Sequence, residues 1–227
     1  MTKQILKRLS KQGFTLVELL VAMGISGVVM AGIYTVYYSQ QKSYVAQEQM
    51  AAMQQNLRAA IYFMEREIRM AAYDPTRDAD AAITIANVAE LEFTKDENGD
   101  GDFTDTNEQI RYALTDDDDG DGIADGSPCH LGRETGGAGG LQAVAENIDA
   151  LNFVYLDEDG SPTATLSEIR SIQITIVARA DRVDPGYTDT NAYYNQQDLV
   201  NPILAAQNDG FRRKRLTTEV KCRNLGL

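Results

Sequence analysis

The chain is poor in the residues that most often carry chemistry. It contains no tryptophan, two cysteines and a single histidine, His130, among 227 residues. The sequence shows no paired catalytic motif, no glycine-rich phosphate loop and no cofactor fingerprint, which are the features that identify an enzyme from its sequence. A catalytic thiol is also disfavoured, because adjacency of Cys129 and His130 in the sequence does not make them a catalytic pair. We therefore expect a non-enzymatic protein.

Basic residues are also in short supply. The chain has 21 lysine and arginine residues against 34 acidic ones, which gives a formal net charge of −13. Because phosphate binding needs a basic surface, this balance argues against nucleic acid as a partner. A strongly acidic chain is better suited to a solvated exterior surface or to a cation site.

The N-terminal stretch combines a basic segment with a long apolar run. Residues 1–13 carry four basic side chains and no acid, and the apolar run begins directly after Gly13 with Phe14. Within this run, Glu18 is the only strongly ionisable group. Since about 20 apolar residues span a bilayer core as a helix, the run predicts one membrane span with its basic flank in the cytoplasm. We place the membrane half of the helix at residues 14–40.

This arrangement differs from that of an ordinary secretory signal, because no small-residue cleavage site follows the apolar run. The order Gly-Phe-Thr-Leu-x-Glu from Gly13 to Glu18 resembles the prepilin leader of type IV pilins and type II secretion pseudopilins. The resemblance implies that a prepilin peptidase cuts after Gly13 and that the new Phe14 amine is methylated. It also implies that Glu18 neutralises the amine of a neighbouring subunit during assembly. Insertion of this carboxylate costs at least about 2.5 kcal/mol, which favours a function over simple snorkelling to the headgroups.

The helix is expected to continue beyond the membrane to about residue 73. Apolar residues recur every three or four positions from Met50 to Ala71, which corresponds to one face of a helix. Pro75 ends the pattern. We place this amphipathic half at residues 41–74.

Residues 75–227 are predicted to form a globular, β-rich domain. Alternation of apolar and polar residues indicates antiparallel strands with one buried face. The predicted strands are residues 83–86, 90–94, 109–114, 148–156, 169–179 and 215–223. The apolar stripe of the helix is the expected cover, which gives an α+β fold. A long mobile loop is expected at 181–210, and the basic cluster at 212–215 is expected to lie solvated or to pair with an acidic neighbouring subunit.

The resemblance extends well beyond the leader. The segments 54–60, 64–71 and 145–155 and the ending 220–225 are similar to those of PilW-type minor pilins, and pseudopilin J of type II secretion shares much of this layout. This similarity implies the type IV pilin fold, a long N-terminal helix packed on an antiparallel sheet. It implies a single-pass inner-membrane protein whose C-terminal domain is periplasmic and then extracellular in the pilus.

The function implied by the resemblance is structural. The chain would be a minor pilin that helps to initiate type IV pilus assembly and lies at or near the tip. Its implied partners are other major and minor pilins, prepilin peptidase and the inner-membrane assembly platform. Two alternatives remain open: a pseudopilin J-like subunit of a secretion pseudopilus, and a calcium-dependent adhesive pilin.

Two acidic segments match the start of a calcium-binding loop. Oxygen ligands at loop positions 1, 3 and 5, a glycine at 6 and a carbonyl at 7 converge on one ion. The candidate ligands are Asp96, Asn98, Asp100, Asp102 and Glu108 in residues 96–108, and Asp117, Asp119, Asp121, Ile123 and Asp125 in residues 117–128. Neither copy has glutamate at position 12. Solvated acidic turns are the alternative, but residues 96–125 hold 12 acids and one arginine, which would repel one another without a cation.

Translocation would place Cys129 and Cys222 on the oxidising side of the membrane, so we expect one disulfide between them. It would close a loop of about 93 residues and contribute about 4 kcal/mol in the chain-entropy model. Two buried free thiols are the alternative.

Overall fold

The computed structural model describes residues 13–137 and 139–226. Residues 1–12 of the predicted leader lie outside this part of the chain. Two compact units make up the protein, Met1–Gln47 and Glu48–Leu227, and helix α1 (Leu16–Ile68) runs from the first into the second.

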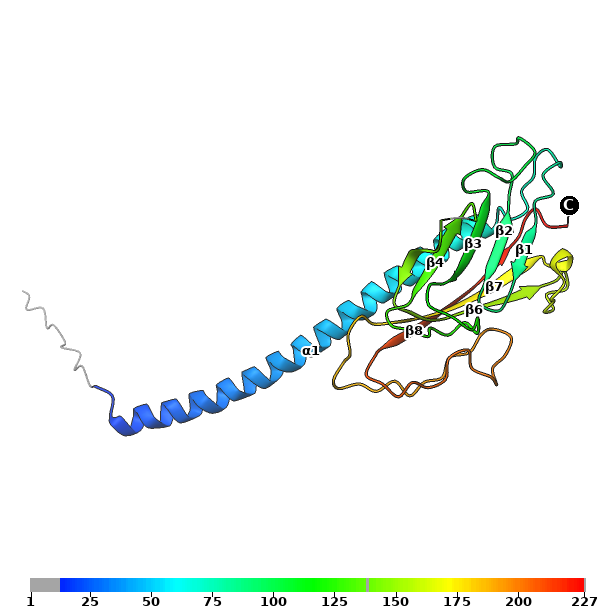
Figure 1. The fold of residues 1–227 in the computed structure, drawn as a ribbon. Helices are drawn as coiled ribbons and strands as arrows, with labels where there is room; N and C mark the ends of the chain where they lie inside the picture. Colours follow the sequence, from blue (N-terminus) through cyan, green and yellow to red (C-terminus); the bar gives the residue numbers. More distant parts are fainter. Residues whose placement is uncertain (1–12, 138, 227) are drawn as a thin grey trace, which may run out of the picture. The chain divides into compact units, whose positions relative to one another are not determined.

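The first unit is the N-terminal part of α1, drawn in blue in Figure 1. Every side chain from residue 13 to residue 45 is exposed, including the whole apolar run. In the described part of the chain, α1 is the one helix that is long and apolar enough to cross a membrane. The apolar surface of residues 13–45 therefore has no partner among the described residues.

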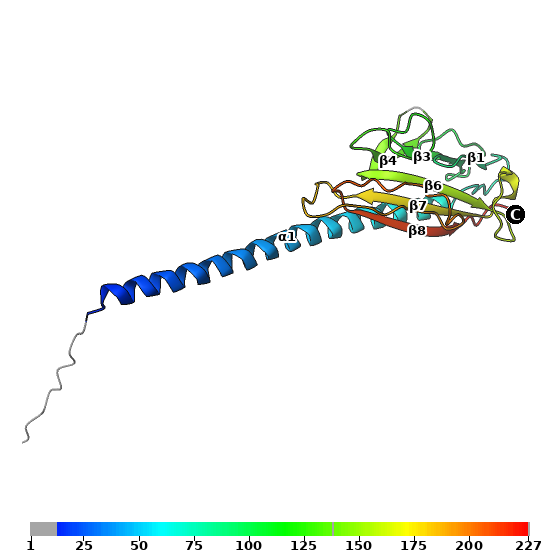
Figure 2. The same cartoon turned by 90° about the horizontal axis from the view of Figure 1, so that it is seen from below.

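The second unit contains two antiparallel sheets. Sheet A has the strand order β1-β2-β3-β4-β5, and sheet B has the order β6-β7-β8. The strands of sheet A are β1 (Ile83–Ala86), β2 (Leu91–Thr94), β3 (Gln109–Leu114), β4 (His130–Thr135) and β5 (Gln142–Glu146). Those of sheet B are β6 (Ile148–Leu156), β7 (Ser171–Arg179) and β8 (Arg213–Lys221), with a short 3-10 helix, η1 (Leu166–Glu168), before β7. Figure 2 shows β6, β7 and β8 side by side along the C-terminal half of α1.

The predicted apolar stripe of α1 forms the centre of the core. Its buried members are Met53, Leu57, Ile61, Met64, Ile68 and, just beyond the helix, Ala71. They pack in one cluster with Phe93 and Tyr112 of sheet A and Ile174 of sheet B. Each fully buried large aliphatic side chain contributes about 1.5–3 kcal/mol relative to exposure. The prediction of an α+β fold, with an apolar N-terminal helix on antiparallel sheets, is confirmed.

Helix α1 ends at Ile68, earlier than the predicted end at about residue 73. The N–H group of Ala71 donates to the carbonyl of Ile68 three residues back, which is the tighter 3-10 pattern. Ala72 then adopts a φ of 59°, and its N–H donates to the carbonyl of Thr94 in β2 at 2.9 Å. A hydrogen bond to the sheet thus ends the helix before Pro75 is reached.

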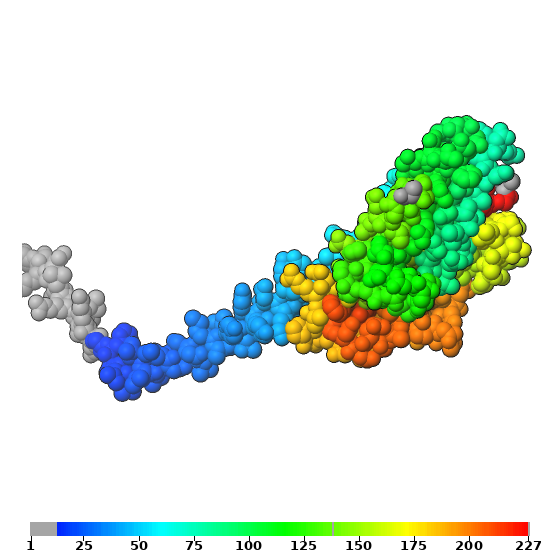
Figure 3. Space-filling model, viewed as in Figure 1, coloured from blue at the N-terminus to red at the C-terminus, as the bar shows by residue number. Residues whose placement is uncertain are grey.

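Strand β7 is buried on both faces, whereas the alternation predicted one buried face. Ile172 and Ile174 pack in the core beneath α1. On the opposite face, Val177 packs against Leu204 of residues 181–210. These residues are here called the strap, and parts of the strap are visible at the surface in the space-filling view (yellow-orange to orange in Figure 3). A long loop was expected at 181–210, and the segment, which the structure describes in full, indeed contains no helix or strand, but part of it packs on sheet B.

Candidate functional sites

The start of α1 holds a reciprocal set of hydrogen bonds between Thr15 and Glu18. The hydroxyl oxygen of Thr15 accepts a bond from the N–H of Glu18 at 3.2 Å. The Glu18 carboxylate accepts bonds in return from the N–H and the hydroxyl of Thr15, both at 2.9 Å. This is the capping box of a Ser/Thr-x-x-Glu sequence. Glu18 therefore stabilises the helix start in the isolated subunit, a role that we did not predict.

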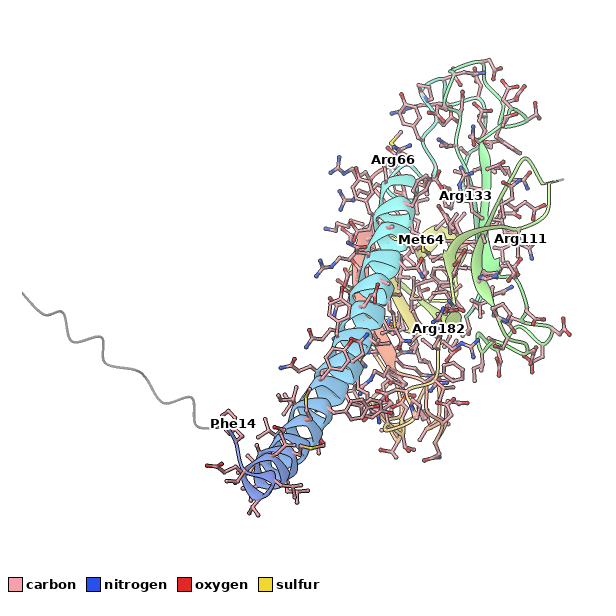
Figure 4. The ribbon with its side chains drawn as sticks, turned by 90° about the vertical axis from the view of Figure 1, so that its left-hand side faces the viewer. Phe14, Met64, Arg66, Arg111, Arg133 and Arg182 are labelled. Carbon is pink, nitrogen blue, oxygen red and sulfur yellow. The ribbon has the colours of Figure 1, made fainter. Side chains whose placement is uncertain are left out.

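Gly13 and Phe14 lie before the helix in open surroundings. The Phe14 side chain is 91% exposed, and Figure 4 labels it at the beginning of the helix. A Cβ added at Gly13 would meet no atom of the described residues within 4 Å. The bond between the two residues is therefore sterically accessible.

Aromatic residues gather where the apolar run gives way to polar sequence. The rings of Tyr34 and Tyr38 stack with their centroids 6.4 Å apart. The Lys42 ammonium lies 4.9 Å from the centroid of the Tyr38 ring. Tyrosine and lysine are typical of the membrane–water interface, so this cluster fits the predicted end of the membrane half at residue 40.

The family described as "Prokaryotic N-terminal methylation motif" matches residues 8–34. The chain carries this methylation motif. The matched segment contains Gly13, Phe14 and Glu18, so the resemblance of this segment to the type IV pilin leader is confirmed. Among solved structures, the chain is similar to a type IV-like pilin from Thermus thermophilus at 13% identity, covering 76% of this chain and 97% of that chain with a TM-score of 0.45. No curated protein matches the chain in sequence.

Away from the methylation motif, residues 117–128 (loop 2) gather carboxylates. Oxygens of Asp117, Asp119 and Asp125 lie within 4.8 Å of one another. Burial raises the pKa of Asp117, and the charges of Asp121 and Asp119 add to this increase. Carboxylate oxygens are the ligands that calcium prefers. A cation among these side chains would relieve their repulsion.

Residues 96–108 (loop 1) share their backbone arrangement with loop 2. In each loop, the first aspartate accepts hydrogen bonds from the N–H groups of two glycines. These residues are Asp96, Gly99 and Gly101 in loop 1, and Asp117, Gly120 and Gly122 in loop 2. All four glycines have φ between 74° and 91°, a conformation that other residues rarely adopt.

The carboxylates of loop 1 are arranged differently. Asp96 and Glu108 are buried, and Glu108 accepts hydrogen bonds from the N–H groups of Glu97 at 2.9 Å and Asp105 at 3.3 Å. These hydrogen bonds fix the conformation of the loop, because the Glu108 carboxylate binds backbone N–H groups of the same loop. The remaining acids of the loop are exposed: Glu97, Asp100, Asp102 and Asp105. Among the described residues, no three carboxylates of loop 1 come as close together as those of loop 2.

The predicted disulfide between Cys129 and Cys222 is wrong, because both cysteines are free and buried. The Cys129 carbonyl accepts a hydrogen bond from Ile148 at the start of β6, whereas the Cys222 N–H donates to Arg170 just before β7. Ile148 pairs with Ala178 near the far end of β7. About eight residues of strand, roughly 25 Å, therefore separate the two sites. A disulfide needs Cα atoms within about 7 Å.

Within the basic cluster at 212–215, Lys214 and Arg215 are exposed, as expected of a solvated strand entrance, but Arg213 is not. Arg213 is buried, and its guanidinium contacts Asp149 at 2.6 Å, Asp189 at 3.3 Å and Asp209 at 2.6 Å. Hydrogen bonds from Arg213 lower the pKa of Asp209. Since Asp189 and Asp209 belong to the strap, this arginine ties the strap to β6 and β8.

A buried ion pair between α1 and sheet A was not predicted. Arg133 of β4 donates two hydrogen bonds to the Glu67 carboxylate, at 2.9 and 2.8 Å, and the Tyr112 hydroxyl donates a third. Burial raises the pKa of Tyr112, and the Glu67 charge raises it further. The sequence did contain a signal for this ion pair. Glu67 lies three residues after Met64 and next to Ile68, on the face of α1 that packs in the core.

Proposed function

We propose that this protein is a minor pilin, a non-enzymatic subunit that helps to initiate assembly of a type IV pilus and lies at or near its tip. The observation that carries the proposal is the methylation motif at residues 8–34, which continues directly into an exposed apolar helix. The apolar surface of residues 16–45 has no partner among the described residues. This surface would be removed from water by the lipid of the inner membrane and later by the helices of other pilins.

In this role, prepilin peptidase cuts after Gly13 and the new Phe14 amine is methylated. The assembly platform then brings the Phe14 amine of a neighbouring subunit to Glu18. That amine competes with the capping bonds that Thr15 makes to the same carboxylate. Because the pair forms in a low dielectric, its attraction is strong enough to offset much of the desolvation of both ions.

Mass spectrometry of protein purified from membranes tests the processing step. We expect the native chain to begin at methylated Phe14 and the Gly13→Ala variant to retain its leader. Gly24→Ala is a matched control, because a Cβ at Gly24 also meets nothing within 4 Å. It should be processed normally. Glu18→Ala should be processed but not incorporated into filaments. Normal processing and normal pili in a Gly13→Ala strain would contradict the proposal.

A subunit of a type II secretion pseudopilus, similar to pseudopilin J, would use the same leader and helix. Deletion of the gene separates the two roles. Loss of surface pili with normal secretion supports the minor pilin, whereas loss of secretion with normal pili supports the pseudopilin.

We further propose that the acidic loops bind calcium and present an ordered surface for adhesion. The support is strongest for loop 2, where three carboxylates approach one another and burial raises the pKa of Asp117. Loop 1 has the same backbone arrangement and is the second candidate. Its ligands would be Asp96, Asn98, Asp100, Asp102 and Glu108. Sites in extracellular modules commonly have dissociation constants of about 10⁻⁴–10⁻³ M.

Calorimetric titration of calcium into residues 41–227, with thermal unfolding alongside, tests the metal sites. We expect one or two ions to bind and, at ten times the dissociation constant, each ion to add about 1.4 kcal/mol to the free energy of unfolding. Asp119→Asn should weaken binding in loop 2, whereas Asp159→Asn, in an exposed turn outside both loops, should not. Absence of heat and of any shift at millimolar calcium would leave the loops as acidic turns.

A further inference from the structure

The side of α1 that faces away from the sheets carries arginine and aromatic side chains. Exposed residues recur there at helical spacing at Arg58, Tyr62, Arg66 and Arg69. Figure 4 shows Arg66 on the side of the helix opposite Met64, which points into the core. This positive surface stands out in a chain whose formal net charge is −13.

An open groove of about 320 Å³ lies on this surface. It is lined by Tyr62, Glu65, Arg66, Arg69, Met70 and Arg223, which we call the arginine face. Its single acid, Glu65, is already engaged by Arg69 at 3.4 Å and by the hydroxyl of Thr218 at 2.7 Å. Tyr62 is 68% exposed and Met70 37% exposed. The groove therefore combines positive charge with accessible apolar area.

Compensation of the helix dipole explains only part of this surface. One basic residue in the last turn, Arg66, suffices to complement the negative end of the helix. It does not explain the exposure of Tyr62 and Phe63 beside it. The Arg66 guanidinium lies 5.8 Å from the Phe63 ring centroid. Arginine next to exposed tyrosine, phenylalanine and methionine is the composition of protein–protein interfaces.

The outer side of loop 1 is complementary to the arginine face. Its exposed carboxylates flank Phe103 in the sequence, and Phe103 is itself 37% exposed. The buried side chains of Asp96 and Glu108 hold this loop in shape. Because the loop is already ordered, binding through it would cost little conformational entropy.

We infer that the arginine face of one subunit binds loop 1 of a second copy of this chain. Phe103 lies against Tyr62 and Met70. The exposed carboxylates of Glu97 and Asp105, which are not among the proposed calcium ligands, lie against the arginines. The two surfaces differ, so the contact joins neighbouring copies near the tip head-to-tail and does not close a two-fold dimer. This inference deepens the proposed filament role and rests on it, but the leader and Glu18 would still serve assembly without it.

Chemical cross-linking of two full-length variants in detergent micelles tests the contact. One copy carries Ala59→Cys beside the arginine face, and a differently tagged copy carries Thr106→Cys in loop 1. Both positions are exposed, and the two native cysteines are buried, so the wild-type mixture gives the background. With a short bis-maleimide, we expect an adduct containing both tags. Ala59→Cys with Ser167→Cys, an exposed position outside loop 1, is the control pair.

Charge reversal identifies the forces that hold the contact. Arg66→Glu with Arg69→Glu should lower the cross-linking yield about fivefold or more, since each exposed ion pair contributes up to about 1 kcal/mol. Arg182→Glu is the matched control, because Arg182 is 81% exposed and lies outside the arginine face. Glu97→Lys with Asp105→Lys in the second copy should restore the yield lost by the double arginine variant.

Three results would overturn the inference. They are a yield no higher than that of the control pair, a yield unaffected by charge reversal, and an adduct that forms only with a different protein. Mass spectrometry of the N-terminus in the same samples shows whether processing after Gly13 is intact. A failed contact is thereby distinguished from a failed leader.

Discussion

Replacement of Arg133 by methionine should lower the free energy of unfolding of the Glu48–Leu227 unit by about 3–5 kcal/mol, because it leaves the Glu67 carboxylate buried without its cation. The Glu67 side chain is 9% exposed and that of Arg133 is 17% exposed. Two of the three hydrogen bonds to this carboxylate come from Arg133. Tyr112 would keep the third, but a neutral hydroxyl cannot balance the charge.

Two further variants divide this free energy among the three side chains. Glu67→Gln combined with Arg133→Met removes both charges and should cost less than Arg133→Met alone, since no uncompensated charge stays buried. Tyr112→Phe removes one hydrogen bond to a charged acceptor and should cost about 1.5–3 kcal/mol. A double-mutant cycle over Glu67 and Arg133 then gives their coupling free energy.

Arg111→Met is the matched control for Arg133→Met. Arg111 also contacts two carboxylates, those of Glu90 and Glu134, but its side chain is 35% exposed. Ion pairs with this degree of exposure contribute about 0–1 kcal/mol. Urea unfolding followed by circular dichroism measures both variants. Equal losses for the two arginines, or a double variant as unstable as Arg133→Met alone, would refute the reasoning from buried charge.

Three other expected outcomes follow from local geometry. The two cysteines should resist thiol reagents in the folded protein and react fully in denaturant, because both are free and buried, and burial raises the pKa of Cys222 to about 12. A thiol count of zero in denaturant would show that the two cysteines form a disulfide after all. Gly122→Ala should lower the thermal unfolding temperature far more than Gly120→Ala. Both glycines have positive φ, so the backbone strain is similar in the two variants. A Cβ at Gly122 would lie 2.3 Å from a backbone oxygen of β6, whereas a Cβ at Gly120 would meet no described atom within 4 Å. The strap at 181–210 should lose hydrogen-exchange protection as the pH falls below about 4. Hydrogen bonds from Arg213 lower the pKa of Asp209, so this pairing holds above the unfolded pKa of about 3.9 and is lost as the pH falls through the folded value. Burial raises the pKa of Asp149, another partner of Arg213, so its share of the pairing is lost first. Unchanged protection at pH 2 would contradict this.

Strong periodicity made much of the fold predictable. The strands 83–86 and 109–114 match the structure at both ends, because alternating apolar residues mark one buried face. Strand 148–156 also matches at both ends, but most of its residues on both faces are buried. Strands β4 and β5 were missed because they contain few large apolar residues, and β5 has only Ala145 buried. The interior of the helix was likewise evident from its stripe, whereas its end depended on a hydrogen bond to β2.

Long-range pairing could not be predicted in the same way. The partners of Arg213 come from β6 and from the strap, so a run of basic residues looked solvated in the sequence. The distance between Cys129 and Cys222 depends on the register of β6 and β7, which residue spacing does not give. Glu67 was overlooked because the residue that neutralises it lies 66 positions later. The local sequence pattern thus predicts most helices and strands. Ion pairs and contacts between distant segments cannot be predicted from that pattern.

Loop 2 has a second consequence, which concerns aggregation. Ile123 forms a β-bridge with Ala150 of β6, and the neighbouring N–H of Ala124 donates to the carbonyl of Asp149 at 3.0 Å. These contacts occupy part of the outer edge of sheet B, where an unpaired strand could otherwise recruit a strand from another molecule. Because the covering segment is densely acidic, it also repels identical chains. Loop 2 thus protects subunits that are crowded together before assembly from pairing edge to edge. The same loop holds the carboxylates of the proposed metal site.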